Sequence, residues 1–159
     1  MNIKLVCVGR LKEKFYQEAV KEFTKRLSRY CKLTILEVAD EKAPEQLSEA
    51  GKAQVLAKEG ERILDRIEDE ETVVALCIEG KQMPSEKLAK TIADWGLAGK
   101  NRITFVIGGS LGLSGAVKMR AQLKLSFSEM TFSHQIFRTM LLEQIYRACK
   151  INAGEPYHK

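Results

Sequence analysis

The sequence is poor in metal-binding residue types. It has only two histidines, His134 and His158, among 159 residues, and its four cysteines form no C-x-x-C pair. Because structural zinc sites use cysteine and histidine at close, regular spacings, no metal is expected here. Most of the cysteines lie in apolar runs, where a thiol packs like a small hydrophobic group, so reduced structural cysteines are predicted.

Long apolar runs are also missing. No segment approaches the roughly 18 consecutive apolar residues that a membrane-spanning helix needs. The apolar opening, residues 1–8, is too short for a signal peptide and has no cleavage-like end. The sequence therefore predicts a cytoplasmic protein that has no membrane partner.

The usual nucleotide motifs are absent as well. There is neither a G-x-G-x-x-G fingerprint nor a G-x-x-x-x-G-K-[ST] loop. The segment Gly108–Gly112 reads G-G-S-L-G, which has the spacing of a hydrolase nucleophile elbow, but no aspartate follows Ser110 to complete a triad. Two interpretations of these glycines stay open, a backbone that approaches a ligand closely and a tight turn.

Charge is distributed unevenly along the chain, whose net charge is +5. Residues 1–30 carry 8 basic and 3 acidic groups, residues 31–70 carry 6 and 11, and residues 71–159 carry 12 and 7. Two basic zones that flank an acidic one are compatible with a polyanion partner such as nucleic acid. A solvated basic helix face explains the first zone equally well.

What the sequence does contain is an alternation of two apolar patterns. Short runs rich in β-branched residues predict strands, and spacings of three and four predict helices between them. Strands are expected at 3–8, 33–38, 72–78, 103–107 and 123–127, and helices at about 16–30, 44–68, 84–96 and 134–149, the last with Ser133 as its N-cap. The pattern predicts one α/β domain around a mainly parallel sheet.

Three predicted strands end in unusual loops. These loops are Glu79–Lys81, Gly108–Gly115 and Ser128–Ser133. Since ligands of open parallel sheets bind outside the carboxyl ends of the strands, the three loops together are the expected pocket.

Titratable and aromatic residues gather near the C-terminus. His134 opens the last predicted helix, and Arg138 shares its face one turn later. Arg147 lies farther along the helix, and the chain ends in Pro156–Lys159. An aromatic group with cationic neighbours suits stacking on an unpaired base and binding to phosphate. A helix cap at His134 and a frayed terminus are the structural alternatives.

Several of these segments together resemble one family. The stretches 105–112, 127–134, 142–148 and 156–159, the opening 3–10 and the total length are similar to the RlmH family, ribosomal RNA large-subunit methyltransferases of the SPOUT class. The resemblance covers the whole chain. Two positions depart from the family pattern: Ser133 stands where proline is frequent, and Lys159 where some members have arginine.

The resemblance implies a fold and an activity. It implies a single SPOUT methyltransferase domain over 1–159, an α/β fold with a mainly parallel sheet flanked by helices and a C-terminal trefoil knot, with a cofactor-binding knot region at about 73–159. It also implies a homodimer with the active sites at its interface. The reaction would be S-adenosylmethionine-dependent methylation of N3 of a pseudouridine in 23S rRNA of the assembled 70S ribosome.

The resemblance further assigns roles to residues of this chain. S-adenosylmethionine would bind largely through backbone groups of Leu76, Gly108, Phe127, Ser128, Glu129, Met130, Thr131 and Phe132. The predicted catalytic residues are His134, Arg147, Tyr157 and His158, and Arg138 and Lys159 are predicted to bind RNA. His134 is a candidate for the base or for a residue that orients the base, and the proton acceptor stays open.

Two other functions remain as alternatives. A non-catalytic ribosome-binding or assembly factor would use the basic N-terminal helix and the tail without affinity for the cofactor. A methyltransferase acting on a small molecule would use the same pocket without RNA.

Overall fold

The computed structural model describes all 159 residues and contains one five-stranded sheet. The strands follow the spatial order β2-β1-β4-β3-β5, and every neighbouring pair is parallel, which confirms the predicted parallel sheet. Their bounds are β1 (Asn2–Val8), β2 (Lys32–Val38), β3 (Thr72–Lys81), β4 (Arg102–Ile107) and β5 (Leu123–Leu125).

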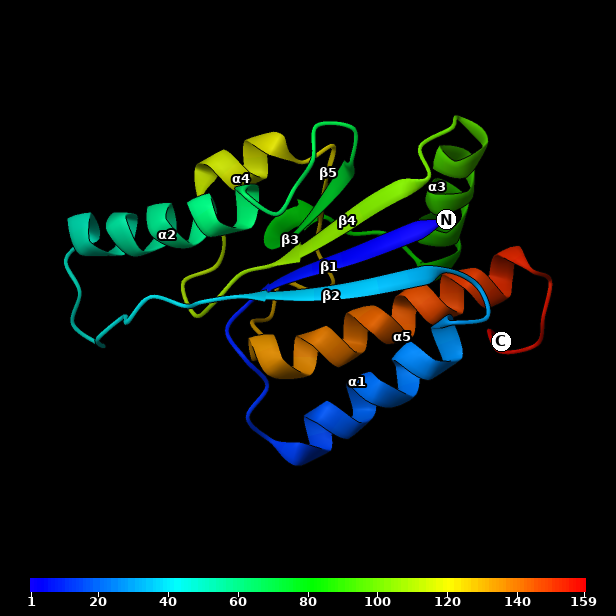
Figure 1. Cartoon of the computed structure of the whole chain (residues 1–159), viewed down its shortest axis with the longest axis horizontal. Coiled ribbons are helices and arrows are strands. Elements are labelled where there is room, and N and C mark those ends of the chain that lie inside the picture. The colour runs from blue at the N-terminus through cyan, green and yellow to red at the C-terminus, as the bar shows by residue number, and fades with distance from the viewer.

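Five helices cover the two faces of the sheet (Figure 1). They are α1 (Lys14–Leu27), α2 (Glu49–Leu64), α3 (Ser85–Leu97), α4 (Gly115–Arg120) and α5 (His134–Asn152). Alternate residues of β1 point to opposite faces, so Leu5 packs in the core beneath α1, α3 and α5, and Val6 packs beneath α2 and α4. The predicted single α/β domain is therefore a three-layer arrangement.

The second helix is shorter than predicted. It spans Glu49–Leu64 instead of 44–68, so Leu47 lies outside it. The Ser48 side chain accepts a hydrogen bond from the N–H of Gly51 and caps the helix there. The apolar spacing alone does not reveal this cap.

Two strands and the last helix also end elsewhere than predicted. Strand β3 continues beyond residue 78 to Lys81, whereas β5 stops at Leu125 instead of 127. Helix α5 continues past residue 149 to Asn152, and Gly154, with φ +66°, follows its end. The Ser133 side chain accepts a hydrogen bond from Gln135, which confirms the predicted N-cap.

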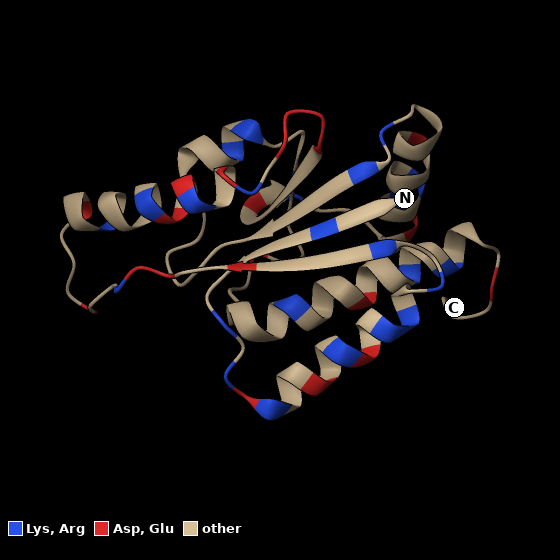
Figure 2. Cartoon of the chain, viewed as in Figure 1, with Lys and Arg blue, Asp and Glu red and all other residues tan.

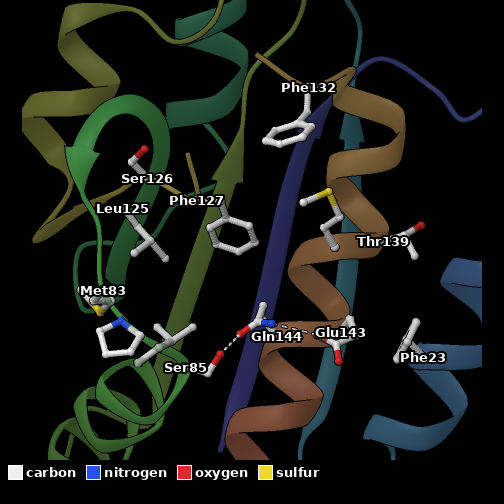
Figure 3. A pocket seen from close by; sticks show the side chains of 13 residues that line it. Phe23, Met83, Ser85, Leu125, Ser126, Phe127, Phe132, Thr139, Glu143 and Gln144 are labelled. Carbon is white, nitrogen blue, oxygen red and sulfur yellow. Dashed lines mark hydrogen bonds between the residues drawn. The ribbon is translucent and has the colours of Figure 1, made fainter. Parts of the chain in front are cut away.

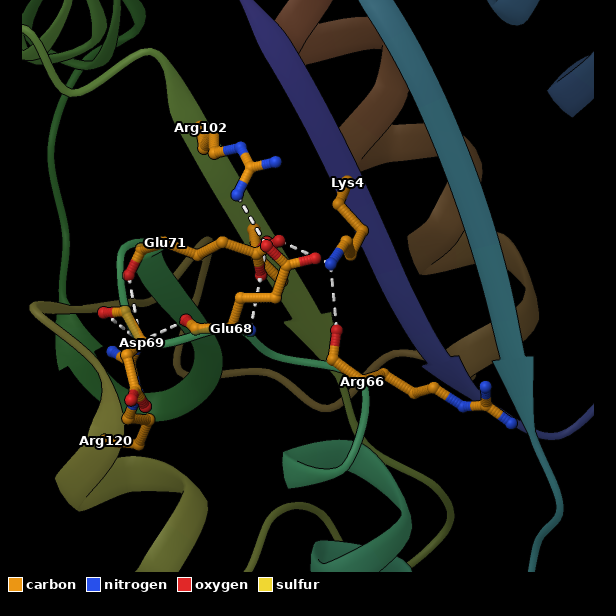
Figure 4. Close-up of polar contacts among 8 residues, drawn as sticks. Lys4, Arg66, Glu68, Asp69, Glu71, Arg102 and Arg120 are labelled. Carbon is orange, nitrogen blue, oxygen red and sulfur yellow. Dashed lines mark hydrogen bonds and ion pairs between the residues drawn. The ribbon is translucent and has the colours of Figure 1, made fainter.

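A polar cluster lies at the amino ends of the strands (Figure 4). The carboxylate of Glu71 is buried and accepts hydrogen bonds from the Lys4 ammonium and, at 2.8 Å, from the Thr104 hydroxyl. Burial alone would raise the pKa of Glu71, but the bonds from Lys4 and Thr104 outweigh it and lower that pKa. Arg120 also donates to the backbone carbonyls of Glu68 and Glu71. The cluster fixes the turn before β3, at the end of the sheet opposite the predicted pocket.

Charged side chains follow the zones that the sequence predicts (Figure 2). Lysines and arginines mark the loop before α1 and α1 itself, while acidic residues are frequent along α2 and its flanking loops. The first basic zone thus lies on the same side of the sheet as α5. None of the helices combines the length and the apolar composition that a bilayer crossing requires.

Candidate functional site

A cavity of about 550 Å³ lies at the carboxyl ends of β3, β4 and β5. All three predicted loops contribute to its wall. Seven of the eight residues predicted to bind the cofactor line it, namely Leu76, Gly108, Phe127, Ser128, Met130, Thr131 and Phe132. Glu129 is exposed and does not line it. Sequence reasoning missed Lys118 and Glu79, which form an ion pair at this cavity.

The segment Gly108–Gly112 forms a tight backbone loop on one wall. A side chain at position 108 is sterically impossible without movement, since its Cβ would lie 2.3 Å from the carbonyl oxygen of Gly112. The N–H of Gly112 donates to the carbonyl of Gly109 at 3.1 Å. Gly109 and Gly112 form an isolated antiparallel bridge, whereas the N–H groups of Ser110 and Leu111 find no acceptor within the chain. The loop therefore presents free backbone donors at the cavity, as a backbone cradle requires.

Ser110 does not have the surroundings of a nucleophile. Its side chain is exposed and makes no hydrogen bond to a histidine or any other base. A serine hydroxyl needs an adjacent base for activation, so the arrangement gives no support to hydrolase chemistry. The chain also contains no group of three His, Cys, Asp or Glu side chains that could hold a metal ion.

His134, the first residue of α5, lies at the mouth of the cavity. A Cβ built on Gly9 would lie 3.8 Å from its Nε2, so the loop after β1 passes beside the ring. Partial burial, and next the positive charge of Arg138, lower the pKa of His134, and Asp40 opposes them. The neutral imidazole, which can accept a proton, is therefore the form present at neutral pH.

The structure does not support the predicted RNA contact of Arg138. Only 2% of this residue is exposed. Its guanidinium donates to the carboxylate of Glu37 at 2.8 Å and to the carbonyl of Gly9 at 3.3 Å. In this structure the guanidinium is buried away from any phosphate, and it links α5 to Glu37 of β2 and to the loop after β1.

Replacing Arg138 by methionine should raise the pKa of His134, because the nearby positive charge is removed while the stem still fills the space. The His134 ring titration can be followed by NMR, and His158→Asn leaves it as the only histidine signal. We expect a wild-type pKa below that of a free histidine. A wild-type value above it would contradict the assignment of a neutral ring.

Three of the four predicted catalytic residues meet at the far end of α5. Arg147 donates to the Glu143 carboxylate at 2.6 Å and contacts the ring of His158 at 3.2 Å. The hydroxyl of Tyr157 donates to the same Glu143 oxygen at 2.9 Å, and His158 also contacts Glu86 at 2.8 Å. We call these five residues the tail cluster. Sequence reasoning missed Glu143 and Glu86, although Glu143 and Arg147 have the i, i+4 spacing of a helical ion pair.

The tail is anchored and is not a frayed end. The ring of Tyr157 packs edge-on against Tyr146, with centroids 4.9 Å apart. Glu155 accepts hydrogen bonds from Lys150 at 2.6 Å and from the Tyr30 hydroxyl at 2.5 Å. Burial, and next the bond to the Glu143 carboxylate, raise the pKa of Tyr157, so its phenol stays protonated at neutral pH. Lys159, predicted to bind RNA, is exposed.

Within one chain, however, the structure does not bring His134 and the tail cluster together. His134 and Arg147 lie 13 positions apart in one helix, a distance of about 20 Å along its axis. Direct cooperation of the two groups on one substrate atom therefore requires a second copy of one of them.

A second cavity, of about 520 Å³, shares part of its wall with the first and extends along α5 to Glu143 (Figure 3). It runs along α5 between α1 and the start of α3. Phe127 and Phe132 lie at the end that it shares with the first cavity, and Glu143 lies at the other end. In Figure 3 the rings of Phe127 and Phe132 are separated from Glu143 along the helix. The walls are mainly apolar, and we call this cavity the groove along α5.

Comparison with known proteins places the chain among methyltransferases. The family model described as "Predicted SPOUT methyltransferase" matches residues 1–158. Two curated relatives, from Lacticaseibacillus casei and Bifidobacterium animalis subsp. lactis, are 60% and 58% identical over 159 residues, which is 100% of both chains in each case. Both are named "Ribosomal RNA large subunit methyltransferase H".

A solved structure supports the fold. A probable methylase family protein from Haemophilus influenzae superposes with a TM-score of 0.56 at 14% sequence identity. The match covers 99% of this chain and 70% of that one. At this identity the similarity concerns the fold alone.

Proposed function

Because the chain belongs to the RlmH family of SPOUT methyltransferases, we propose that it methylates N3 of a pseudouridine in 23S ribosomal RNA of the assembled ribosome, with S-adenosylmethionine as methyl donor. The observation that carries the proposal is the cavity at the carboxyl ends of β3, β4 and β5, together with the free donors of its glycine loop. Ribosomes as substrate imply a cytoplasmic location.

The cavity suits S-adenosylmethionine in size and chemistry. Its volume of about 550 Å³ falls within the range of about 300–1,000 Å³ that is typical of ligand pockets. Apolar side chains such as Leu76 and Phe127 offer contacts for a flat adenine ring, and the N–H groups of Ser110 and Leu111 offer donors for polar atoms. When bound, the cofactor supplies a methyl group on a cationic sulfonium.

The reaction transfers that methyl group to the N3 nitrogen. With the cofactor bound, N3 would lose its proton and its electron pair would form the new N–C bond, with release of S-adenosylhomocysteine. The neutral ring of His134 can accept or orient the proton at the cavity mouth. Arg147, as a permanent cation, can stabilise the negative charge that develops on the uracil ring. Tyr157 and Glu143 hold the Arg147 guanidinium in one orientation.

We propose further that the enzyme is a homodimer in which α5 of two copies pack antiparallel across the groove along α5. In a symmetric antiparallel pair that crosses between Met140 and Leu141, position 134 of one helix faces position 147 of the other. His134 would then approach Arg147 of the partner subunit, which would overcome the separation within one chain. The apolar lining of the groove supports this arrangement. The trefoil knot implied by the family stays a prediction.

A direct assay tests the proposed activity. The purified protein, isotopically labelled S-adenosylmethionine and ribosomes from a strain without the modification should yield 3-methylpseudouridine, identified by mass spectrometry of the nucleosides. Free nucleosides serve as the control for a small-molecule enzyme and should stay unmethylated. No transfer to either 70S ribosomes or 50S subunits would contradict the proposal, and ribosome binding without cofactor affinity in calorimetry would favour an assembly factor.

A further inference from the structure

The carboxyl group of Glu59 is buried against the glycine loop. Glu59 and Gly60 are consecutive residues of α2, and each contacts one end of the segment 109–114. A Cβ built on Gly109 would lie 3.2 and 3.3 Å from the two Glu59 carboxyl oxygens, and one built on Gly60 would lie 2.4 Å from the Ser114 hydroxyl. Helix α2, which lies beside α4 in Figure 1, therefore packs directly against the loop.

This carboxyl group has one oxygen without a partner. Glu59 is only 4% exposed. Its Oε2 accepts a hydrogen bond from the N–H of Glu41 at 3.0 Å, whereas its Oε1 is buried and makes none. Buried polar atoms are nearly always hydrogen-bonded, so an unpaired acceptor at this place requires an explanation.

The loop above Glu59 contains backbone N–H donors that lack an acceptor. The N–H groups of Ser110 and Leu111 have no acceptor within the chain, while Gly109 is bridged to Gly112. An unpaired acceptor thus lies beside a loop that holds two unpaired donors, and a Cβ at position 109 would crowd this contact, since it would also lie 3.1 Å from Val8 Cγ1.

We propose that Glu59 is a positioning residue for the cofactor loop: its Oε1 accepts the N–H of Ser110 or Leu111 when the loop closes on S-adenosylmethionine. This inference rests on the proposed function. Glu59 lies on the far side of the loop from the cavity and does not line it. It affects cofactor binding only through the loop, by fixing the position of the backbone segment that begins at Gly108.

The charges around Glu59 make this role dependent on pH. Burial is the largest factor that raises the pKa of Glu59, and Asp40 and Glu41 add to it, while the Glu41 N–H and the Arg62 guanidinium oppose it. Protonation would leave the carboxyl group a weaker acceptor. The contribution of Glu59 to cofactor binding should therefore be present above this raised pKa and be lost as the pH falls through it.

The substitution Glu59→Gln tests the role with little change in shape. An amide has one acceptor oxygen where the carboxylate has two, so it cannot serve both the Glu41 N–H and the loop. We expect calorimetry at about pH 8 to show an affinity for S-adenosylmethionine about three- to tenfold weaker than that of the wild type. This decrease corresponds to the loss of one hydrogen bond. The turnover rate at saturating cofactor should not change. Glu61→Gln, an exposed position on the same helix, is the matched control and should bind like the wild type.

The ratio of the wild-type and Glu59→Gln affinities gives a second readout. This ratio should approach one as the pH is lowered. Protonation of His134 affects both proteins equally, so it does not change the ratio. In the wild type, hydrogen exchange should show that the amides of residues 110 and 111 gain protection when the cofactor binds. A Glu59→Gln affinity equal to that of the wild type at every pH, or amides that gain no protection, would overturn the inference alone. A wild type that does not bind S-adenosylmethionine would overturn both this inference and the proposed function.

Discussion

Gly108→Ala is expected to weaken binding of S-adenosylmethionine by about 100-fold. The new Cβ would lie 2.3 Å from the carbonyl oxygen and 2.5 Å from the carbonyl carbon of Gly112, and backbone atoms cannot rotate away as a side chain does. The loop must shift by about 1 Å, which is enough to cost roughly 100-fold in a preorganised site. The crowding should also reduce the free energy of unfolding by about 1–3 kcal/mol.

Calorimetry measures the affinity and urea denaturation the stability. Gly115→Ala is the matched control, since a Cβ there meets no atom within 4 Å and its φ is not in the positive range. The control should bind the cofactor like the wild type. Equal affinities for Gly108→Ala and Gly115→Ala would show that the loop is not the cofactor cradle.

The location of the pocket was predictable because it depends on local features. Each strand is recognisable in the sequence as a run of apolar residues, and each of the three loops follows such a run directly. In a parallel sheet the carboxyl ends of the strands lie at one edge, and the three loops meet there because β4, β3 and β5 are neighbours in the sheet. The order β2-β1-β4-β3-β5 was not predicted, because apolar runs do not specify which strand lies beside which.

The roles of charged side chains were less predictable. Arg138 looks like any exposed basic residue of an amphipathic helix, but it is buried by Glu37, 101 positions earlier in the chain. Glu59 likewise stands in an acidic helix and carries no local sign that it faces the loop at Gly109. Contacts across the fold decide the environment of such groups, and no single sequence segment contains both partners.

For the tail, too, the sequence does not reveal the contacts that decide its role. Its aromatic and basic residues suggested a function, and a frayed end was the alternative. What distinguishes the two is Glu143, which receives bonds from both Arg147 and Tyr157 and orders the tail on α5. Sequence reasoning placed the tail residues and His134 in one site, whereas a single chain keeps them apart, and this separation is the strongest reason to expect a second subunit.

Arg147→Ala should reduce methyl transfer by at least about 100-fold, the usual loss when a group that stabilises transition-state charge is removed. Its affinity for S-adenosylmethionine should stay unchanged, since Arg147 does not line the cofactor cavity. The stability loss should be at most about 1 kcal/mol, because the pair with Glu143 is partly solvent-exposed. His134→Ala should likewise bind the cofactor and lose about 100-fold or more in rate.

Mixing these two inactive variants tests whether the site is shared. In a heterodimer of His134→Ala with Arg147→Ala, a shared arrangement leaves one site with both groups intact and one site with neither. Random exchange makes half of the dimers heterodimeric, so about a quarter of the wild-type activity should return. If His134 and Arg147 acted within one chain, every site would lack one group and mixing would restore nothing. Recovery must also depend on subunit exchange: a mixture assayed before exchange should be inactive, because the missing group can come only from a partner helix packed in the groove along α5.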